Sequence, residues 1–146
     1  MGCKYETAMQ RNVSPAGYLN PSLLKVVQKI RSMVGEPITI NDWHKGGGFI
    51  NSGVRDLRHP FNSSFSRHYM GLCADLKFPM ASQTVHAQLF GENNTLDYIK
   101  CFTHETPEMK VLKKCGLTAV ENIELTTGWI HVSVEFTGMD KIKVIG

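Results

Sequence analysis

The chain has 146 residues, of which 42% are hydrophobic and 20% charged, and its formal net charge is +3. These values are typical of one soluble globular domain with a sizeable core, and they exclude a disordered chain. No apolar run reaches the ~20 residues that a membrane-spanning helix needs, so we expect no membrane insertion. Lysines and arginines are not concentrated among aromatic side chains, so we also expect no nucleic-acid partner.

Residues 1–20 hold scattered polar groups with Pro15 and Gly17 and little periodicity, which predicts an arm that lies on the domain or on a partner. A charge appears as early as Lys4 and no apolar stretch follows, so we expect no signal peptide. The four cysteines lack any C-x-x-C pairing and are expected as free thiols in a reducing cytoplasm. The folded domain is therefore predicted over residues 21–146.

Hydrophobic residues recur at helical spacing over residues 21–34, and the segment lies between Asn20, a good cap, and Gly35, a good stop. Pro21 suits the first turn of such a helix. Residues 37–40 follow with β-branched side chains and predict a short strand. We therefore expect the helix to pack on a sheet that this strand begins.

Residues 41–65 are rich in Gly, Asn, Ser and His and are too many for a simple connector, which is typical of a loop that builds a site. Residues 72–78 are predicted as a central strand. Helical patterns cover residues 82–90 and 106–115, and Thr106 can cap the second of them. Strands and helices thus share the middle of the chain.

Two extended runs, residues 118–125 and 129–136, surround a Thr-Thr-Gly sequence and predict a hairpin. Alternation along the second run puts Trp129, His131, Ser133 and Glu135 on one face, and Ile130, Val132, Val134 and Phe136 on the other. The second set is wholly apolar and is expected in the core, so His131 should face away from it towards a cleft.

Two short segments, SRHYMGLCADL from Ser66 and WIHVS from Trp129, contain the residues that suggest a chemistry. His68 and Asp75 can meet only if the chain turns between them, and Gly71 allows that turn. Together with His131 they make two imidazoles and one carboxylate. This is the ligand set of a catalytic zinc that keeps its fourth position open.

These segments resemble the zinc peptidases that include D-Ala-D-Ala carboxypeptidases, the VanX and VanY enzymes, phage L-alanyl-D-glutamate endolysins and the related hedgehog signalling domain. The resemblance runs from about Pro37 to Phe136, and it includes Ile-Thr-Ile-Asn at residues 38–41 and a Ser-Gly-x-Arg turn at residues 52–55. It implies zinc held by His68, Asp75 and His131, and cleavage of peptidoglycan stem peptides. It also implies a single-domain, hedgehog-like α+β fold with a small antiparallel sheet flanked by helices.

Three further residues are expected to contact substrate. A guanidinium near the metal can bind a carboxylate or carbonyl and stabilise developing charge, which the resemblance implies for Arg55; the alternative is a surface salt bridge to Asp56 or Asp42. Ser66 can bond substrate or stabilise a turn. Trp129 can pack against a peptide or close the edge of the core.

The general base remains open between two residues. Several related enzymes carry a carboxylate three residues before the last His, where this chain has Gly128; others have a Glu six before, and Glu124 stands seven before His131. A three-residue hairpin loop would put Glu121 on the face of His131, whereas a two- or four-residue loop would put Glu124 there. We prefer Glu124, which is closer to the hairpin mouth, with Glu121 as the alternative.

The expected function is that of a zinc-dependent peptidoglycan peptidase, either a bacteriophage endolysin, a virion-associated lysin or a D,D-carboxypeptidase. An endolysin would accumulate in the host cytoplasm and leave through a holin pore, and a virion lysin could attach to other virion proteins through residues 1–20. The alternative is a structural or interaction module that keeps zinc without hydrolysis, which Gly128 favours.

Overall fold

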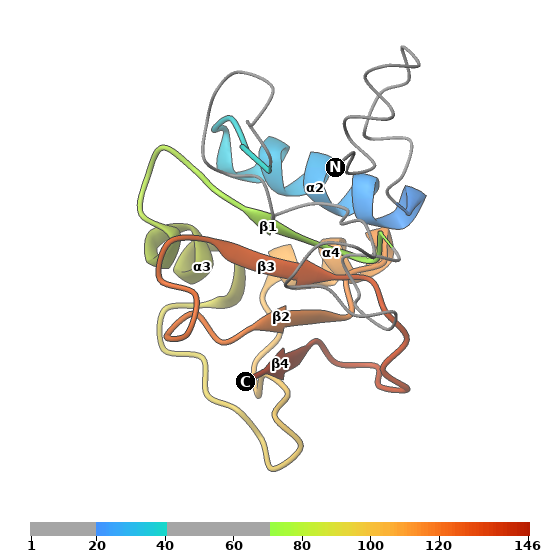
Figure 1. Ribbon diagram of the computed structural model, residues 1–146. Helices are drawn as coiled ribbons and strands as arrows, with labels where there is room; N and C mark the ends of the chain where they lie inside the picture. The colour runs from blue at the N-terminus through green and yellow to red at the C-terminus, as the bar shows by residue number, and fades with distance from the viewer. Residues whose placement is uncertain (1–19, 41–70) are drawn as a thin grey trace, which may run out of the picture.

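A computed structural model of the chain describes residues 20–40 and 71–146, where helices cover one side of a four-stranded sheet (Figure 1). The elements in chain order are α2 (Pro21–Val34), β1 (Cys73–Leu76), α3 (Ser82–Phe90), α4 (Pro107–Cys115), β2 (Ala119–Glu121), β3 (Ile130–Ser133) and β4 (Lys143–Ile145). The fold is α+β, as predicted. The predicted arm, except Asn20, and the whole of the long loop over residues 41–65 lie outside the described residues.

The helices begin and end where the sequence predicts. Asn20 caps α2 by accepting a hydrogen bond from the Ser22 N–H at 2.9 Å, and Gly35 ends that helix with a φ of 75°. Thr106 caps α4 in the same way, through the Met109 N–H at 3.1 Å. These signals act within one turn of the chain, which is why the sequence reveals them.

None of these helices is long and apolar enough to cross a membrane.

The strand order is β1-β3-β2-β4. β3 pairs antiparallel with both β1 and β2, whereas β4 runs parallel to β2. The sheet is therefore mixed: the antiparallel pairing that the sequence predicts holds for β1, β3 and β2 but not for β4. The prediction that residues 72–78 form a central strand is wrong in position. They contain β1, which is at one end of this order, whereas β3 lies inside it.

The strand predicted over residues 37–40 is reduced to a single pair. Thr39 and Lys77 form an isolated antiparallel bridge, with backbone N–O distances of 2.9 and 3.0 Å. Pro37 has no N–H to donate to a longer ladder. Residues 38–40 thus extend the β1 side of the sheet without forming a strand of their own.

The predicted tight hairpin is longer than expected. β2 ends at Glu121 and β3 begins at Ile130, so residues 122–129 connect them in place of a three-residue loop. The side chain of Asn122 accepts a hydrogen bond from the Glu124 N–H at 3.1 Å and starts a turn there. An Asn side chain that bonds the backbone two residues on competes with strand pairing, which explains the early end of β2.

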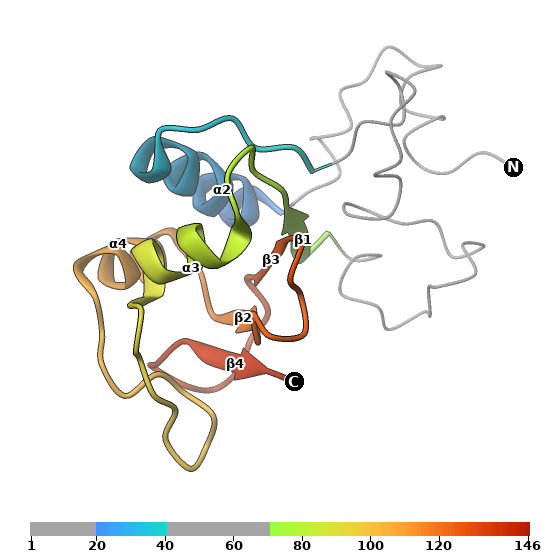
Figure 2. The ribbon, with the colours of Figure 1, turned by 90° about the vertical axis from the view of Figure 1, so that its left-hand side faces the viewer.

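The core lies between the helices and one face of the sheet (Figure 2). Ile130 and Val132 are buried in it, as predicted, and belong to one cluster with apolar side chains from all three helices. Val134 packs against the core edge, but the expectation for Phe136 is wrong, since its side chain is 96% exposed. β3 ends at Ser133, so the alternation that would turn Phe136 inward does not continue.

Candidate metal centre

The candidate centre occupies the sheet face opposite the helices. Cys73 pairs with Ser133, and Asp75 with His131, across the β1–β3 ladder. Because strand side chains alternate, these four project away from the face that carries the core residues. His131 therefore faces away from the core, as the alternation predicts.

Asp75 and His131 are in direct contact. The Asp75 Oδ1 lies 2.7 Å from the His131 Nδ1, although the residues are 56 positions apart in the chain. Their side chains are only 13% and 11% exposed, respectively, so water screens the contact weakly. Two of the three predicted ligands are thus brought together by strand register. A carboxylate oxygen and an imidazole nitrogen are both ligand types that zinc accepts.

Glu121 is the second carboxylate at this place. Its Oε2 lies 3.9 Å from the His131 Nδ1, and its side chain is 34% exposed, which leaves it access to water. The β2–β3 register pairs Val120 with Val132, so Glu121 comes opposite His131. Two carboxylates around one imidazole give the site a negative character that favours a bound cation.

Glu124, the preferred base of the sequence analysis, lies in the connection and is exposed. The connection is longer than the two-, three- and four-residue loops of the sequence analysis. The β2–β3 pairing nevertheless puts the same residues on each face as the three-residue loop would, so Glu121 shares the face of His131. Trp129 comes two residues before His131 and is 36% exposed. Arg55, Ser66 and His68 lie outside the described residues.

A small pocket lies beside the Thr39–Lys77 bridge. It has a volume of about 290 Å³ and is lined by Pro37, Thr39, Lys77, Phe78, Pro79 and Gly128. The sequence analysis did not single out these residues as a group.

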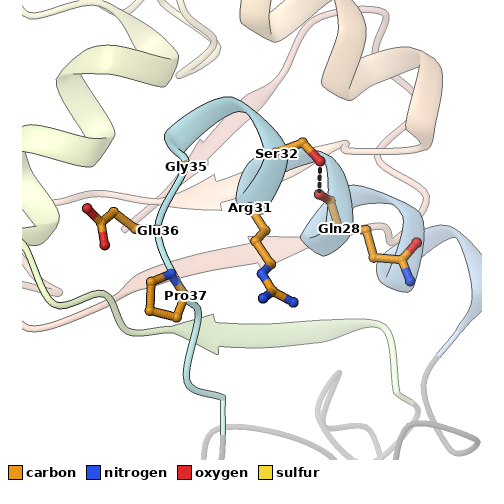
Figure 3. A pocket seen from close by; sticks show the side chains of 6 residues that line it. All are labelled: Gln28, Arg31, Ser32, Gly35, Glu36 and Pro37. Carbon is orange, nitrogen blue, oxygen red and sulfur yellow. Dashed lines mark hydrogen bonds between the residues drawn. The ribbon is translucent and has the colours of Figure 1, made fainter.

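A larger pocket of about 490 Å³ lies at the C-terminal end of α2 and is drawn in Figure 3. It is lined by Gln28, Arg31, Ser32, Gly35, Glu36 and Pro37. The Ser32 hydroxyl donates to the Gln28 carbonyl at 3.1 Å, so part of its polar lining is occupied within the helix. None of these residues belongs to the Asp75–His131 pair.

Within residues 20–40 and 71–146, no three His, Cys, Asp or Glu side chains form a complete metal-binding group. Of the three predicted ligands, Asp75 and His131 are described and in contact, and His68 belongs to a segment that is not described. Comparison of the chain with protein-family models, curated proteins and solved structures finds no match.

Proposed function

We propose that the protein is a zinc-dependent peptidase that cleaves a stem-peptide bond of bacterial peptidoglycan, with zinc held by His68, Asp75 and His131. The observation that carries the proposal is the 2.7 Å contact between Asp75 and His131 on the face opposite the core. Removing a carboxylate and an imidazole from water is unfavourable unless they are paired or bind a cation. Their donor atoms fit zinc, and the nearby Glu121 carboxylate fits a proton-transfer role.

Zinc bound there would polarise the scissile carbonyl and lower the pKa of water towards about 7. Glu121 then accepts a proton on its carboxylate as the water oxygen bonds to the carbonyl carbon, and it returns this proton to the amine nitrogen when the C–N bond breaks. Arg55 stabilises the negative carbonyl oxygen, while Ser66 and Trp129 hold the peptide. Glu121 replaces Glu124 as the preferred base because it is the carboxylate 3.9 Å from His131.

The biological setting that we propose is a bacteriophage lysin, either released from the host cytoplasm or carried in the virion through contacts of residues 1–20. A second candidate is a zinc-binding structural module of the virion without hydrolysis. Gly128 favours this second candidate, because several enzymes of the resembled family carry a carboxylate at that position.

The first experiment measures zinc by elemental analysis and then incubates the protein with peptidoglycan, with and without chelator, before mass spectrometry of the fragments. We expect one zinc per chain and new amino termini that a chelator suppresses. Glu121→Gln should lower kcat by about 10²- to 10⁴-fold, the usual contribution of a general base, while zinc stays bound.

Glu124→Gln is the matched control and should keep kcat within about threefold of wild type, because its carboxylate is exposed in the connection. The opposite pattern, with Glu124→Gln inactive and Glu121→Gln active, would assign the base to Glu124. Bound zinc without cleavage of any wall type supports the structural module, and absence of zinc overturns the ligand assignment.

A further inference from the structure

We propose that the turn formed by residues 96–101 is an interaction surface that binds the headgroup region of an anionic lipid bilayer. This inference goes beyond the proposed peptidase function and does not depend on it. It is carried by the exposed apolar side chains of the turn, by the hydrogen bonds that fix its shape and by the lysines around it.

Exposed apolar side chains are concentrated on this turn. Six large hydrophobic side chains are exposed among the described residues, and three of them lie here: Leu96 at 42%, Tyr98 at 97% and Ile99 at 38%. Single exposed hydrophobic residues are normal on a protein surface, whereas a group of them marks a contact with a partner or a membrane. The connection between α3 and α4, which contains the turn, extends away from the sheet in both views (Figure 1 and Figure 2). The turn is therefore placed for a contact outside the domain.

Asp97 holds the turn in one shape. Its Oδ1 accepts hydrogen bonds from the Ile99 N–H at 3.1 Å and from the Cys101 N–H at 2.9 Å. Its backbone N–H donates to the Cys101 carbonyl at 2.8 Å, and its own carbonyl accepts from the Lys100 N–H at 3.0 Å. Its Oδ2 lies 3.0 Å from the Lys141 Nζ. The backbone of the turn is thus fixed by polar contacts, although its apolar side chains are exposed.

The backbone of Lys100 shows that this shape is imposed by its surroundings. Its φ is 59°, and it is the one residue other than glycine with a positive φ among those described. Such a conformation is unfavourable for a residue with a Cβ and persists only where neighbouring contacts determine it. The Val144 N–H donates to the Lys100 carbonyl at 2.7 Å, and Cys101 pairs with Lys143, so the turn is bonded to β4. A turn fixed in advance loses little conformational entropy on binding, which suits a contact surface.

The charges around the turn indicate its partner. Lys100 belongs to the turn, Lys141 pairs with Asp97 and Lys143 pairs with the backbone of Cys101, so three ammonium groups surround one carboxylate. The Lys100 Nζ also donates to the backbone oxygen of residue 146 at 2.8 Å. Lysine is depleted in the core of protein–protein interfaces, whereas tyrosine and apolar side chains beside lysines are typical of surfaces that bind anionic lipid headgroups. An anionic bilayer surface is therefore the partner that we assign.

The contact that we infer is interfacial. A tyrosine places an apolar ring and a polar hydroxyl at the depth of the headgroups, and Leu96 and Ile99 add further apolar surface beside it. The lysines attract the anionic headgroups, an interaction that salt screens. Three apolar side chains and a few charges give weak and reversible binding, and this binding needs no segment that spans the bilayer.

The test is sedimentation of the full chain with sucrose-loaded vesicles, made of phosphatidylcholine alone or of an equal mixture with phosphatidylglycerol. We expect the partition coefficient to be at least roughly tenfold higher for the mixed vesicles at low salt, and this preference to disappear at about 1 M salt. Lys143→Gln should lower partition into mixed vesicles about fivefold, the effect of one lysine near an anionic surface. Lys110→Gln, at an exposed lysine on α4, is the charge control and should change it by less than about twofold.

The apolar part of the contact is tested at Tyr98. Tyr98→Ser should lower partition into mixed vesicles roughly tenfold, because the bilayer no longer covers an aromatic ring. Phe136→Ser is the matched control: its ring is 96% exposed but lies outside the turn, so we expect a change of less than about twofold. Both side chains are almost wholly exposed, so the circular dichroism spectrum of each variant should match that of the wild type.

Tyr98→Trp provides a second readout, because brominated lipid should quench the fluorescence that this variant adds to that of the wild type. Quenching of this added signal, together with the losses in Tyr98→Ser and Lys143→Gln, supports the assignment. Equal partition into both kinds of vesicle, an equal loss in Tyr98→Ser and Phe136→Ser, or an unquenched Tyr98→Trp signal overturns it.

Discussion

Asp75 and His131 face each other because they are register partners on adjacent antiparallel strands. A shift of one residue in this pairing would turn Asp75 into the core and bring Ala74 to the site face. Both faces of the β1–β3 pair therefore oppose a shift in register. Apolar contacts do so on the core face, and the 2.7 Å contact between Asp75 and His131 does so on the other face. The backbone pairing of β1 and β3 thus brings the two donor atoms together.

Zinc should stabilise the protein through this pair. A ligand that binds only the folded state at a hundred times its Kd adds about 2.7 kcal/mol to the free energy of unfolding. We expect urea unfolding with and without zinc to show an increment of this order for wild type and for Glu124→Gln. Asp75→Ala should lose most of the increment, whatever its metal-free stability. An undiminished increment in Asp75→Ala would place the metal elsewhere.

At the scale of elements, α3 contains a histidine that the sequence did not single out. The His86 ring lies 4.8 Å from the Phe90 ring and 6.1 Å from the Phe102 ring. Burial lowers the pKa of His86 from its ordinary 6.5 to about 4, because the charged imidazolium is disfavoured away from water. Between pH 6.5 and about 4, His86 is therefore protonated in the unfolded chain and neutral in the folded protein.

His86 should therefore make the protein less stable as the pH falls from about 6.5 to about 4, with no effect above that window. We expect a loss on the order of 2 kcal/mol at pH 4.5, measured by urea unfolding against pH 7.5. His86→Phe keeps an aromatic ring without a titrating group. Between pH 7.5 and 4.5, its free energy of unfolding should therefore fall by about 2 kcal/mol less than that of the wild type. Parallel pH curves for the two proteins would contradict the assignment.

Two helix ends make a matched pair. Gly35 and Gly116 end α2 and α4 with φ values of 75° and 114°, conformations that disfavour other residues. A Cβ at Gly35 would meet nothing within 4 Å, whereas one at Gly116 would lie 2.9 Å from the Cβ of Ser22 on α2. The contact between α2 and α4 thus requires a glycine at the second position for an additional reason.

Gly35→Ala should lower the free energy of unfolding by about 1 kcal/mol from backbone strain alone. Gly116→Ala should lower it by about 1 to 3 kcal/mol more, since a close contact between the two helices adds to the strain. Chemical denaturation measures both. Ser22→Gly removes the Cβ that the new methyl group would approach. In that background the extra destabilisation of Gly116→Ala over Gly35→Ala should shrink, and an unchanged difference would refute the steric explanation.

The helices were predictable because their signals are local, whereas the sheet was not. Caps at Asn20 and Thr106 and stops at Gly35 and Gly116 lie next to the residues that they control. Strand order depends on contacts between distant segments, and nothing near β1 or β4 in the sequence indicates which strand lies beside it. β2 ends early because the Asn122 side chain binds the backbone two residues on, in competition with strand pairing. Hydrophobic alternation does not reveal this competition.

At the scale of the whole molecule, the meeting of Asp75 and His131 was predictable, whereas the role of His68 stays a prediction. The alternation along β3 correctly put His131 on the face opposite the core. The position of Glu121 relative to Glu124 depended on the register across residues 122–129, which the turn residues alone did not determine. The pocket beside the Thr39–Lys77 bridge was overlooked because it combines three separate chain segments.

The strand order also has a consequence for synthesis on the ribosome. β3 lies between β1 and β2 but follows both in the chain, and His131 is made 56 residues after Asp75. At roughly 5 to 20 residues per second, that delay is about 3 to 11 seconds. During this time β1, α3 and α4 lack the strand that joins the sheet. Any nascent chain released before β3 would carry Asp75 without its imidazole partner, so the contact between Asp75 and His131 can form only after translation has passed that strand.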